Sequence, residues 1–125
     1  MTDKKKIKAF VQDVLGCGCA EEVFLLIELR QEEMAGKKYD HINVGNRLLI
    51  YVFRTGDARF VAEALQSIVL AGKEERDAGG FNRFRLVLAT DATRAGSAAT
   101  KAYDKLAFLD DRIHLHVIGK SQVTF

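Results

Sequence analysis

The nine residues from Asn46 to Arg54 are apolar on both sides when they are placed in an extended chain. Side chains alternate across a β-strand, so every second residue shares a face. One face carries Leu48, Ile50 and Val52, and the other carries Leu49, Tyr51 and Phe53. A strand with two apolar faces is covered on both sides, as it is in a sheet that lies between helices. We therefore predict that residues 47–54 form the central strand of a mixed sheet.

Length and charge limit the classes of protein to be considered. The chain has 125 residues, no proline and no break in composition, so we expect a single α/β domain over residues 1–125. A net charge of +2 is too small to indicate a nucleic-acid partner. No apolar run reaches the roughly 18–20 residues of a membrane span, so we expect no membrane partner. Two cysteines one residue apart are a poor disulfide framework, and a reducing cytoplasm is the expected location.

Three segments have the apolar spacing of amphipathic helices. The first covers residues 7–15 and ends at Gly16, the second covers residues 57–78, and the third follows a cap at Asp91 or Thr93 and buries residues 95–106. A shorter helical turn is expected over residues 20–24. These segments predict three main helices.

The remaining apolar segments predict strands. Residues 25–32 alternate like a strand, although their composition also favours a helix. Residues 36–40 form the turn that leads back into residues 42–44 and the central strand, with a break or bulge at Gly45. Residues 84–89 and 113–118 complete the set. The predicted fold is α/β, with a mixed four-stranded sheet in which an antiparallel hairpin precedes a parallel β-α-β-α-β section.

Two of the predicted strand–helix units resemble each other. Each strand begins with Asn-Arg, at Asn46-Arg47 and Asn82-Arg83, and each ends at a threonine that is soon followed by an aspartate. Strands that are joined through a helix lie parallel with a right-handed crossover. The repeat therefore places Arg47 and Arg83 together at the amino ends of the strands.

Polar residues gather at the opposite, carboxyl ends of the same strands. They are Thr55, Asp57, Thr90, Asp91 and Lys120. Ligands of open α/β sheets bind outside the carboxyl ends of strands, where helix amino ends can receive an anion. We predict a ligand edge here. The alternative is that the threonines and aspartates are ordinary helix caps.

A Cys17-Gly18-Cys19 corner follows the first helix. Cys19, at the start of the next helical turn, would have its thiol pKa lowered, whereas the thiol of Cys17 would lie at the negative end of the first helix. The pair could act as a dithiol, or bind zinc together with His114 and His116, which share one face of the last strand. The alternative is that both cysteines are buried and inert.

The sequence contains no complete catalytic constellation, so whether the chain is an enzyme stays undecided. Arginines interleaved with phenylalanines around Arg83 and Arg85 resemble a single-strand binding surface, but the small net charge argues against it. The first interpretation is a non-enzymatic module that binds a small molecule or a protein, with homodimerisation through the edge strand as a further expectation. The second is a thiol-redox or metal-binding protein that uses the Cys17-Gly18-Cys19 corner.

Overall fold

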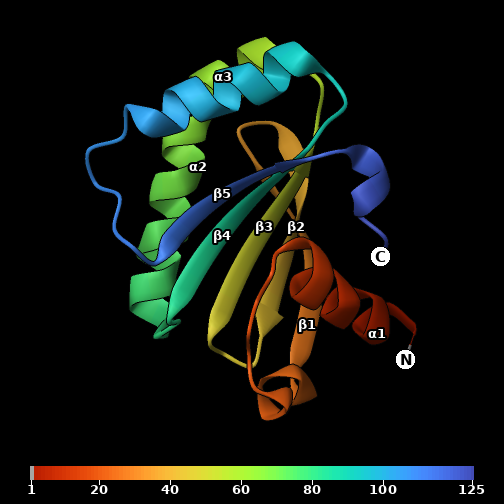
Figure 1. The fold of residues 1–125 in the computed structure, drawn as a ribbon. Coiled ribbons are helices and arrows are strands. Elements are labelled where there is room, and N and C mark those ends of the chain that lie inside the picture. The colour runs from red at the N-terminus through yellow and green to blue at the C-terminus, as the bar shows by residue number, and fades with distance from the viewer. Residues whose placement is uncertain (1) are drawn as a thin grey trace.

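Five strands form one mixed sheet in the computed structural model, which describes residues 2–125 (Figure 1). The strands are β1 (Ile27–Met34), β2 (Lys37–Val44), β3 (Leu48–Arg54), β4 (Arg83–Ala89) and β5 (Ile113–Ile118). They lie side by side in chain order. The pairs β1–β2 and β2–β3 are antiparallel, and the pairs β3–β4 and β4–β5 are parallel. The predicted α/β class, the central strand and the parallel β-α-β-α-β section are confirmed.

The prediction of four strands is wrong, because residues 42–44 and the central strand belong to two different strands. Gly45 and Asn46 both have positive φ angles, of 63° and 56°, and with Arg47 they form the tight turn between β2 and β3. Glycine adopts this conformation readily and asparagine tolerates it, so such a pair between apolar runs is typical of a hairpin. The side chain of Asn43 accepts a hydrogen bond from the Asn46 amide at 2.8 Å and holds the turn.

The first hairpin turn is also shorter than predicted. It consists of Ala35 and Gly36, with φ angles of 54° and 81°, and the strand resumes at Lys37. Residues 37–40, predicted as a turn, therefore pair with β1. Lys37 and Lys38 hide the start of this strand in the sequence, because two polar residues in succession break the alternation of polar and apolar residues.

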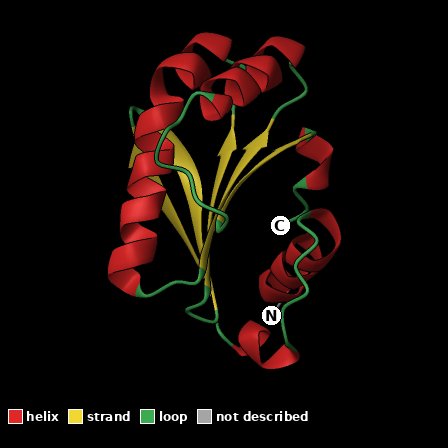
Figure 2. Cartoon of the chain, turned by 60° about the vertical axis from the view of Figure 1, so that its left-hand side comes forward, coloured by secondary structure: helices red, strands yellow, loops and turns green. Residues whose placement is uncertain are grey.

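Helices cover both faces of the sheet (Figure 2). They are α1 (Thr2–Ala9), which continues as the π-helical turn η1 (Phe10–Val14), α2 (Ala58–Gly79) and α3 (Thr93–Asp104), with the short 3-10 turns η2 (Glu21–Leu25) and η3 (Lys120–Gln122). The two longer helices, α2 and α3, pack on one face, and α1 lies on the other beside the C-terminal tail (Figures 1 and 2). The predicted three main helices are confirmed.

Each face of the sheet has its own apolar core. On the α2 and α3 side, Leu49, Tyr51 and Phe53 pack against the helices, and Gly72 lets α2 approach the ring of Phe84 closely. On the α1 side, alternate residues of β3 pack beneath α1, and the rings of Phe10 and Phe125 lie 5.1 Å apart. Burial of these faces is the main stabilising contribution to such a fold.

Within residues 2–125, no helix combines the length and the apolar character that a bilayer crossing requires.

Candidate functional site

A basic pocket of about 300 Å³ opens at the amino ends of the parallel strands. One wall is the corner that follows η1, and the other is the beginning of β3 and β4. The lining residues are Cys17, Gly18, Cys19, Val23, Arg47, Leu48, Asn82, Arg83 and Arg85. Figure 1 shows the chain after α1 running down beside the start of β3. The pocket therefore lies between an N-terminal loop and the sheet.

The backbone of Arg47 fixes the two Asn-Arg pairs beside each other. Its carbonyl oxygen accepts hydrogen bonds from the amides of Asn82, at 2.8 Å, and Arg83, at 3.1 Å. In the parallel pair Leu48 lies opposite Arg83, and the same offset continues to the strand ends. The expectation that Arg47 and Arg83 lie together at the amino ends is confirmed. Their side chains are exposed, and neither pairs with a carboxylate in the described residues.

The outer wall of the pocket depends on Gly45. A Cβ at this position would overlap the backbone of Val23, and the Gly45 amide donates to Leu26 O at 2.7 Å. The hairpin turn between β2 and β3 thus holds η2 against the sheet. This contact positions the corner over the arginines.

Arg85 is the buried charged residue of the pocket lining, with 8% of its surface exposed. Its Nη1 donates to the carbonyl of Leu15, at 2.9 Å, and lies 2.9 Å from Nε2 of His116. Its buried Nε has no hydrogen-bond partner among the described residues. The carbonyl at the end of the N-terminal helical segment carries only a partial negative charge. Burial, and then the neighbouring Arg83, lower the pKa of the Arg85 guanidinium.

Two histidines of β5 lie beside Arg85. His114 lies opposite Arg85 in the register of β4 and β5, and His116 follows on the same face. Burial and then Arg85 lower the pKa of His114, and the same two causes lower that of His116 to about 4. Since Arg85 is always a donor, Nε2 of neutral His116 accepts its hydrogen bond. Protonation of His116 would break this contact.

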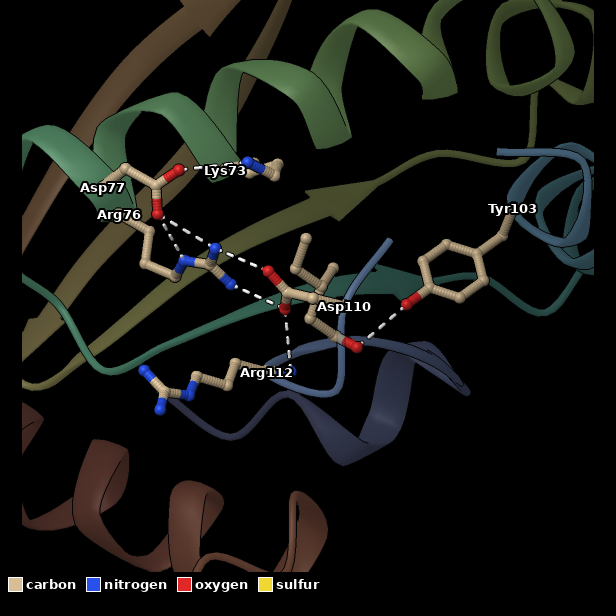
Figure 3. Close-up of polar contacts among 7 residues, drawn as sticks. Lys73, Arg76, Asp77, Tyr103, Asp110 and Arg112 are labelled. Carbon is tan, nitrogen blue, oxygen red and sulfur yellow. Dashed lines mark hydrogen bonds and ion pairs between the residues drawn. The ribbon is translucent and has the colours of Figure 1, made fainter. Parts of the chain in front are cut away.

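The chain has a second buried arginine, Arg76, which lies on α2. Unlike Arg85, it is surrounded by carboxylates (Figure 3). It is 6% exposed and donates to both carboxylate oxygens of Asp110, at 2.9 and 2.7 Å, and to Asp77. Hydrogen bonding to Asp110 raises the pKa of Arg76 and lowers that of Asp110 to about 2. Arg76 fastens the loop before β5 to α2, and its charge is compensated within the protein.

Cys17 and Cys19 are joined by a disulfide in the wall of the basic pocket. The expectation that the pair is a poor disulfide framework is therefore wrong. The two Cα atoms lie 5.3 Å apart across Gly18, a separation typical of disulfides. Both cysteines are half-buried, and Ala20 rather than Cys19 is the cap of η2.

The predicted zinc site would require the Cys17–Cys19 disulfide to be reduced to two thiols. Zinc is bound by thiolates, and the sulfurs of Cys17 and Cys19 are bonded to each other here. Among residues 4–125, whose side chains the structure describes, no group of three or more histidine, cysteine and acidic side chains is placed to hold a metal ion. His114 and His116 do share a face, as predicted, but the polar neighbour of His116 is Arg85. A metal site formed by Cys17, Cys19, His114 and His116 stays a prediction.

The polar groups of the predicted ligand edge are brought together, but most bond locally. The hydroxyls of Thr55 and Thr90 accept from the amides two residues later, at 3.1 and 3.0 Å. Asp57 caps α2 by accepting from two amides, each at 3.1 Å. The prediction that Asp91 or Thr93 caps α3 is wrong, because the cap residue is Ala92 and Thr93 is the first residue of the helix. Asp91 accepts from the amide of Lys120, at 3.2 Å. Ligand binding at this edge stays a prediction.

A polar cluster on the α2 side of the sheet is also satisfied internally. Nε2 of His41 lies 2.6 Å from Glu75, and the hydroxyl of Tyr51 donates to the same carboxylate. Burial, followed by the hydrogen bond to Glu75, raises the pKa of Tyr51. This cluster attaches α2 to β2 and β3.

A larger hollow, of about 580 Å³, lies between α2 and α3. Its basic residues, Arg94, Lys101 and Lys105, are all exposed to solvent. Exposed cations are well hydrated and need no ligand, whereas a buried one does. The pocket around Arg85 is therefore the stronger candidate.

Part of this site could be recognised from the sequence. An arginine at position 85, inside the apolar strand from Phe84 to Ala89, is a polar residue where both faces should be buried. The repeat also predicted the neighbouring Arg47. What could not be foreseen is that the Cys17-Gly18-Cys19 corner lies over these arginines, because this contact depends on how the loop after α1 returns to the sheet.

Comparison of the chain with protein-family models, with curated proteins and with solved structures gave no significant match.

Proposed function

We propose that this protein is a non-enzymatic binding module whose ligand is a small anion seated in the basic pocket. The observation that carries the proposal is Arg85, a buried cation that has no carboxylate partner in the part of the chain that the structure describes. A buried charge is stable only when an opposite charge or several hydrogen bonds compensate it. Arg76 shows how this chain compensates such a charge with its own acids. At Arg85 the compensating group would come from the ligand.

The lining of the pocket favours a phosphate, sulfate or carboxylate group. The guanidinium of arginine is planar and binds these anions through paired hydrogen bonds. Arg47 and Arg83 add two exposed cations beside Arg85, and the Asn82 side chain adds an amide. Leu48 and Val23 provide an apolar wall for the rest of the ligand. A volume of about 300 Å³ suits a compact organic anion better than an extended polymer.

The proposal is tested with inorganic phosphate and pyrophosphate at constant ionic strength. We expect saturable shifts of the backbone amide NMR signals around residues 82–85 and a rise in Tm. Arg83→Gln should weaken binding at least about tenfold, the size of one lost charge-assisted hydrogen bond. Arg59→Gln is the matched control, because Arg59 lies exposed on α2. Equal responses of the wild type, Arg83→Gln and Arg59→Gln would contradict a specific site.

Binding of a partner protein is the second form of the same proposal. An acidic side chain or a chain terminus of a partner carries the same carboxylate that the pocket would accept. Homodimerisation through the exposed face of an edge strand also stays a prediction. Light scattering with and without phosphate separates these cases, because a small anion leaves the mass of the particle unchanged.

A further inference from the structure

We infer that the Cys17–Cys19 disulfide exchanges with a small thiol that carries negative charge, and that the arginines of the basic pocket select this thiol. The inference rests on the proposed function, because the same cations that bind an anion would hold the charged group of the thiol. The observation behind it is a juxtaposition. The disulfide and the side chains of Arg47, Arg83 and Arg85 line one pocket.

The disulfide is accessible but held in place. Both cysteines are half-buried, and the amide of Cys17 donates to Val11 O at 3.0 Å, which ties the corner to the end of the N-terminal helical segment. Gly16, with φ of 69°, and Gly18 flank Cys17, and a Cβ at either glycine would meet open space. A small reagent can therefore approach the sulfurs from the pocket side.

The charge of the pocket favours each chemical step. A thiolate is the attacking species, and positive charge raises its local concentration and lowers the pKa of a nearby thiol. The leaving group is also a thiolate, and it would be released beside the arginines. In the described residues no ion pair involves Arg47, Arg83 or Arg85, so these charges are available for both roles.

The exchange balances in two steps. A thiolate RS⁻ attacks one cysteine sulfur, the Cys17–Cys19 bond breaks, and a mixed disulfide forms while the other cysteine leaves with the electron pair as a thiolate. A second RS⁻ attacks the sulfur of R in the mixed disulfide, which forms RSSR and releases the second cysteine thiolate. Two thiols are oxidised and one protein disulfide is reduced. The reverse sequence, with RSSR as oxidant, closes the corner again.

The class of reagent follows from the pocket. It is a low-molecular-weight thiol, or its disulfide, that carries a carboxylate, sulfonate or phosphate within a few bonds of the sulfur. A neutral thiol would gain nothing from the arginines, and a cationic thiol would be repelled. This ordering by charge is the property that an exposed disulfide without the pocket would lack.

The test uses three thiols of equal chain length on the full-length protein. They are 2-mercaptoethanesulfonate, 2-mercaptoethanol and 2-aminoethanethiol, with rates normalised to the thiolate concentration and opening followed by mass spectrometry. We expect the anionic thiol to react about tenfold faster than the neutral one at low salt, and the cationic one to be slowest. The ratio should fall as salt is added. In Arg47→Gln and Arg83→Gln the three rates should converge, while Arg59→Gln should keep the wild-type order.

Equal normalised rates for the anionic and neutral thiols would overturn the inference, as would an order unchanged in Arg47→Gln and Arg83→Gln. A Cys17→Ser, Cys19→Ser double variant separates this failure from that of the proposed function. If phosphate still shifts the signals around residues 82–85 in this variant while the rates are equal, the pocket binds anions and the exchange is wrong. If phosphate causes no shift in either protein and the rates are equal, both are wrong.

Discussion

Arg76 on α2 and Arg85 on β4 are both buried. In the described residues, only Arg76 forms ion pairs with carboxylates. Arg76, 6% exposed, donates to two aspartates, and its pKa is raised by the hydrogen bonds to Asp110 (Figure 3). Arg85, 8% exposed, has a carbonyl, a neutral histidine and a second arginine as neighbours, and burial lowers its pKa. The same side chain thus serves two purposes. Arg76 holds the loop before β5 to α2. The charge of Arg85 has no carboxylate partner in the described residues, and we propose that a bound anion compensates it.

Removal of each charge should give the largest contrast. Arg76→Met would leave Asp110 without its ion-pair partner and Asp77 with Lys73 alone, and we expect a loss of about 2 kcal/mol in the free energy of unfolding. The loss is smaller than for a fully buried pair because both carboxylates are more than one-third exposed. Arg85→Met removes an uncompensated cation, so the free energy should change by less than about 1 kcal/mol or rise. Urea unfolding of both variants measures the difference, and equal losses would contradict the contrast.

Added phosphate should stabilise the wild-type protein but not the variants that lack an arginine of the pocket. At ten times the dissociation constant, phosphate should raise the free energy of unfolding of the wild type by about 1.4 kcal/mol. Arg85→Met and Arg83→Gln should gain much less at the same ionic strength. Thermal unfolding at several phosphate concentrations checks this. A gain of the same size in Arg85→Met would show that the anion binds elsewhere.

The histidine beside Arg85 should make stability depend on pH. The pKa of His116 falls from an ordinary value of 6.5 to about 4 in the folded protein, so the unfolded chain binds more protons between these values. Stability should therefore fall as the pH drops from about 6.5 towards 4, by on the order of 1 kcal/mol after allowance for solvent screening. His116→Gln should remove this part of the loss, and bound phosphate should reduce it. Parallel pH profiles of the wild type and His116→Gln would contradict the contact.

Substitution at the carboxyl ends of the strands should give the smallest loss of stability and should leave phosphate binding unchanged. Asp57→Ala removes the cap of α2, which should cost about 0.5–1 kcal/mol of stability. Phosphate binding should be unchanged, because the pocket lies at the other ends of the strands. The measurement pairs urea unfolding with a phosphate titration of this variant. Weaker binding in Asp57→Ala would restore the ligand edge that the sequence predicted.

The sequence was informative where one segment decides its own structure. The two apolar faces of residues 47–54, the spacing of α2 and the last strand all follow from local patterns, and they were predicted correctly. The sequence predicts only a break or bulge at Gly45, because a three-residue turn leaves the apolar pattern nearly continuous. For the site, the repeat predicted the pairing of Arg47 with Arg83.

Features that depend on distant contacts were not predictable in the same way. The burial of Arg85 requires the carbonyl of Leu15, which lies 70 residues away in the chain. The opposite roles of Arg76 and Arg85 follow from which loop each one meets, Asp110 in the first case and the Cys17-Gly18-Cys19 corner in the second. Neither loop has a periodic pattern that fixes its path.

The most direct measurement is a phosphate titration followed through the side-chain Nε–H NMR signals of the arginines. We predict that the Arg85 signal moves saturably and becomes better protected from exchange with solvent, while the Arg76 signal, already bonded to Asp77 at 3.1 Å, stays in place. If the Arg85 signal does not move, or moves in proportion to that of exposed Arg59, then the buried charge of Arg85 is not compensated by a ligand, and the proposed binding site is wrong.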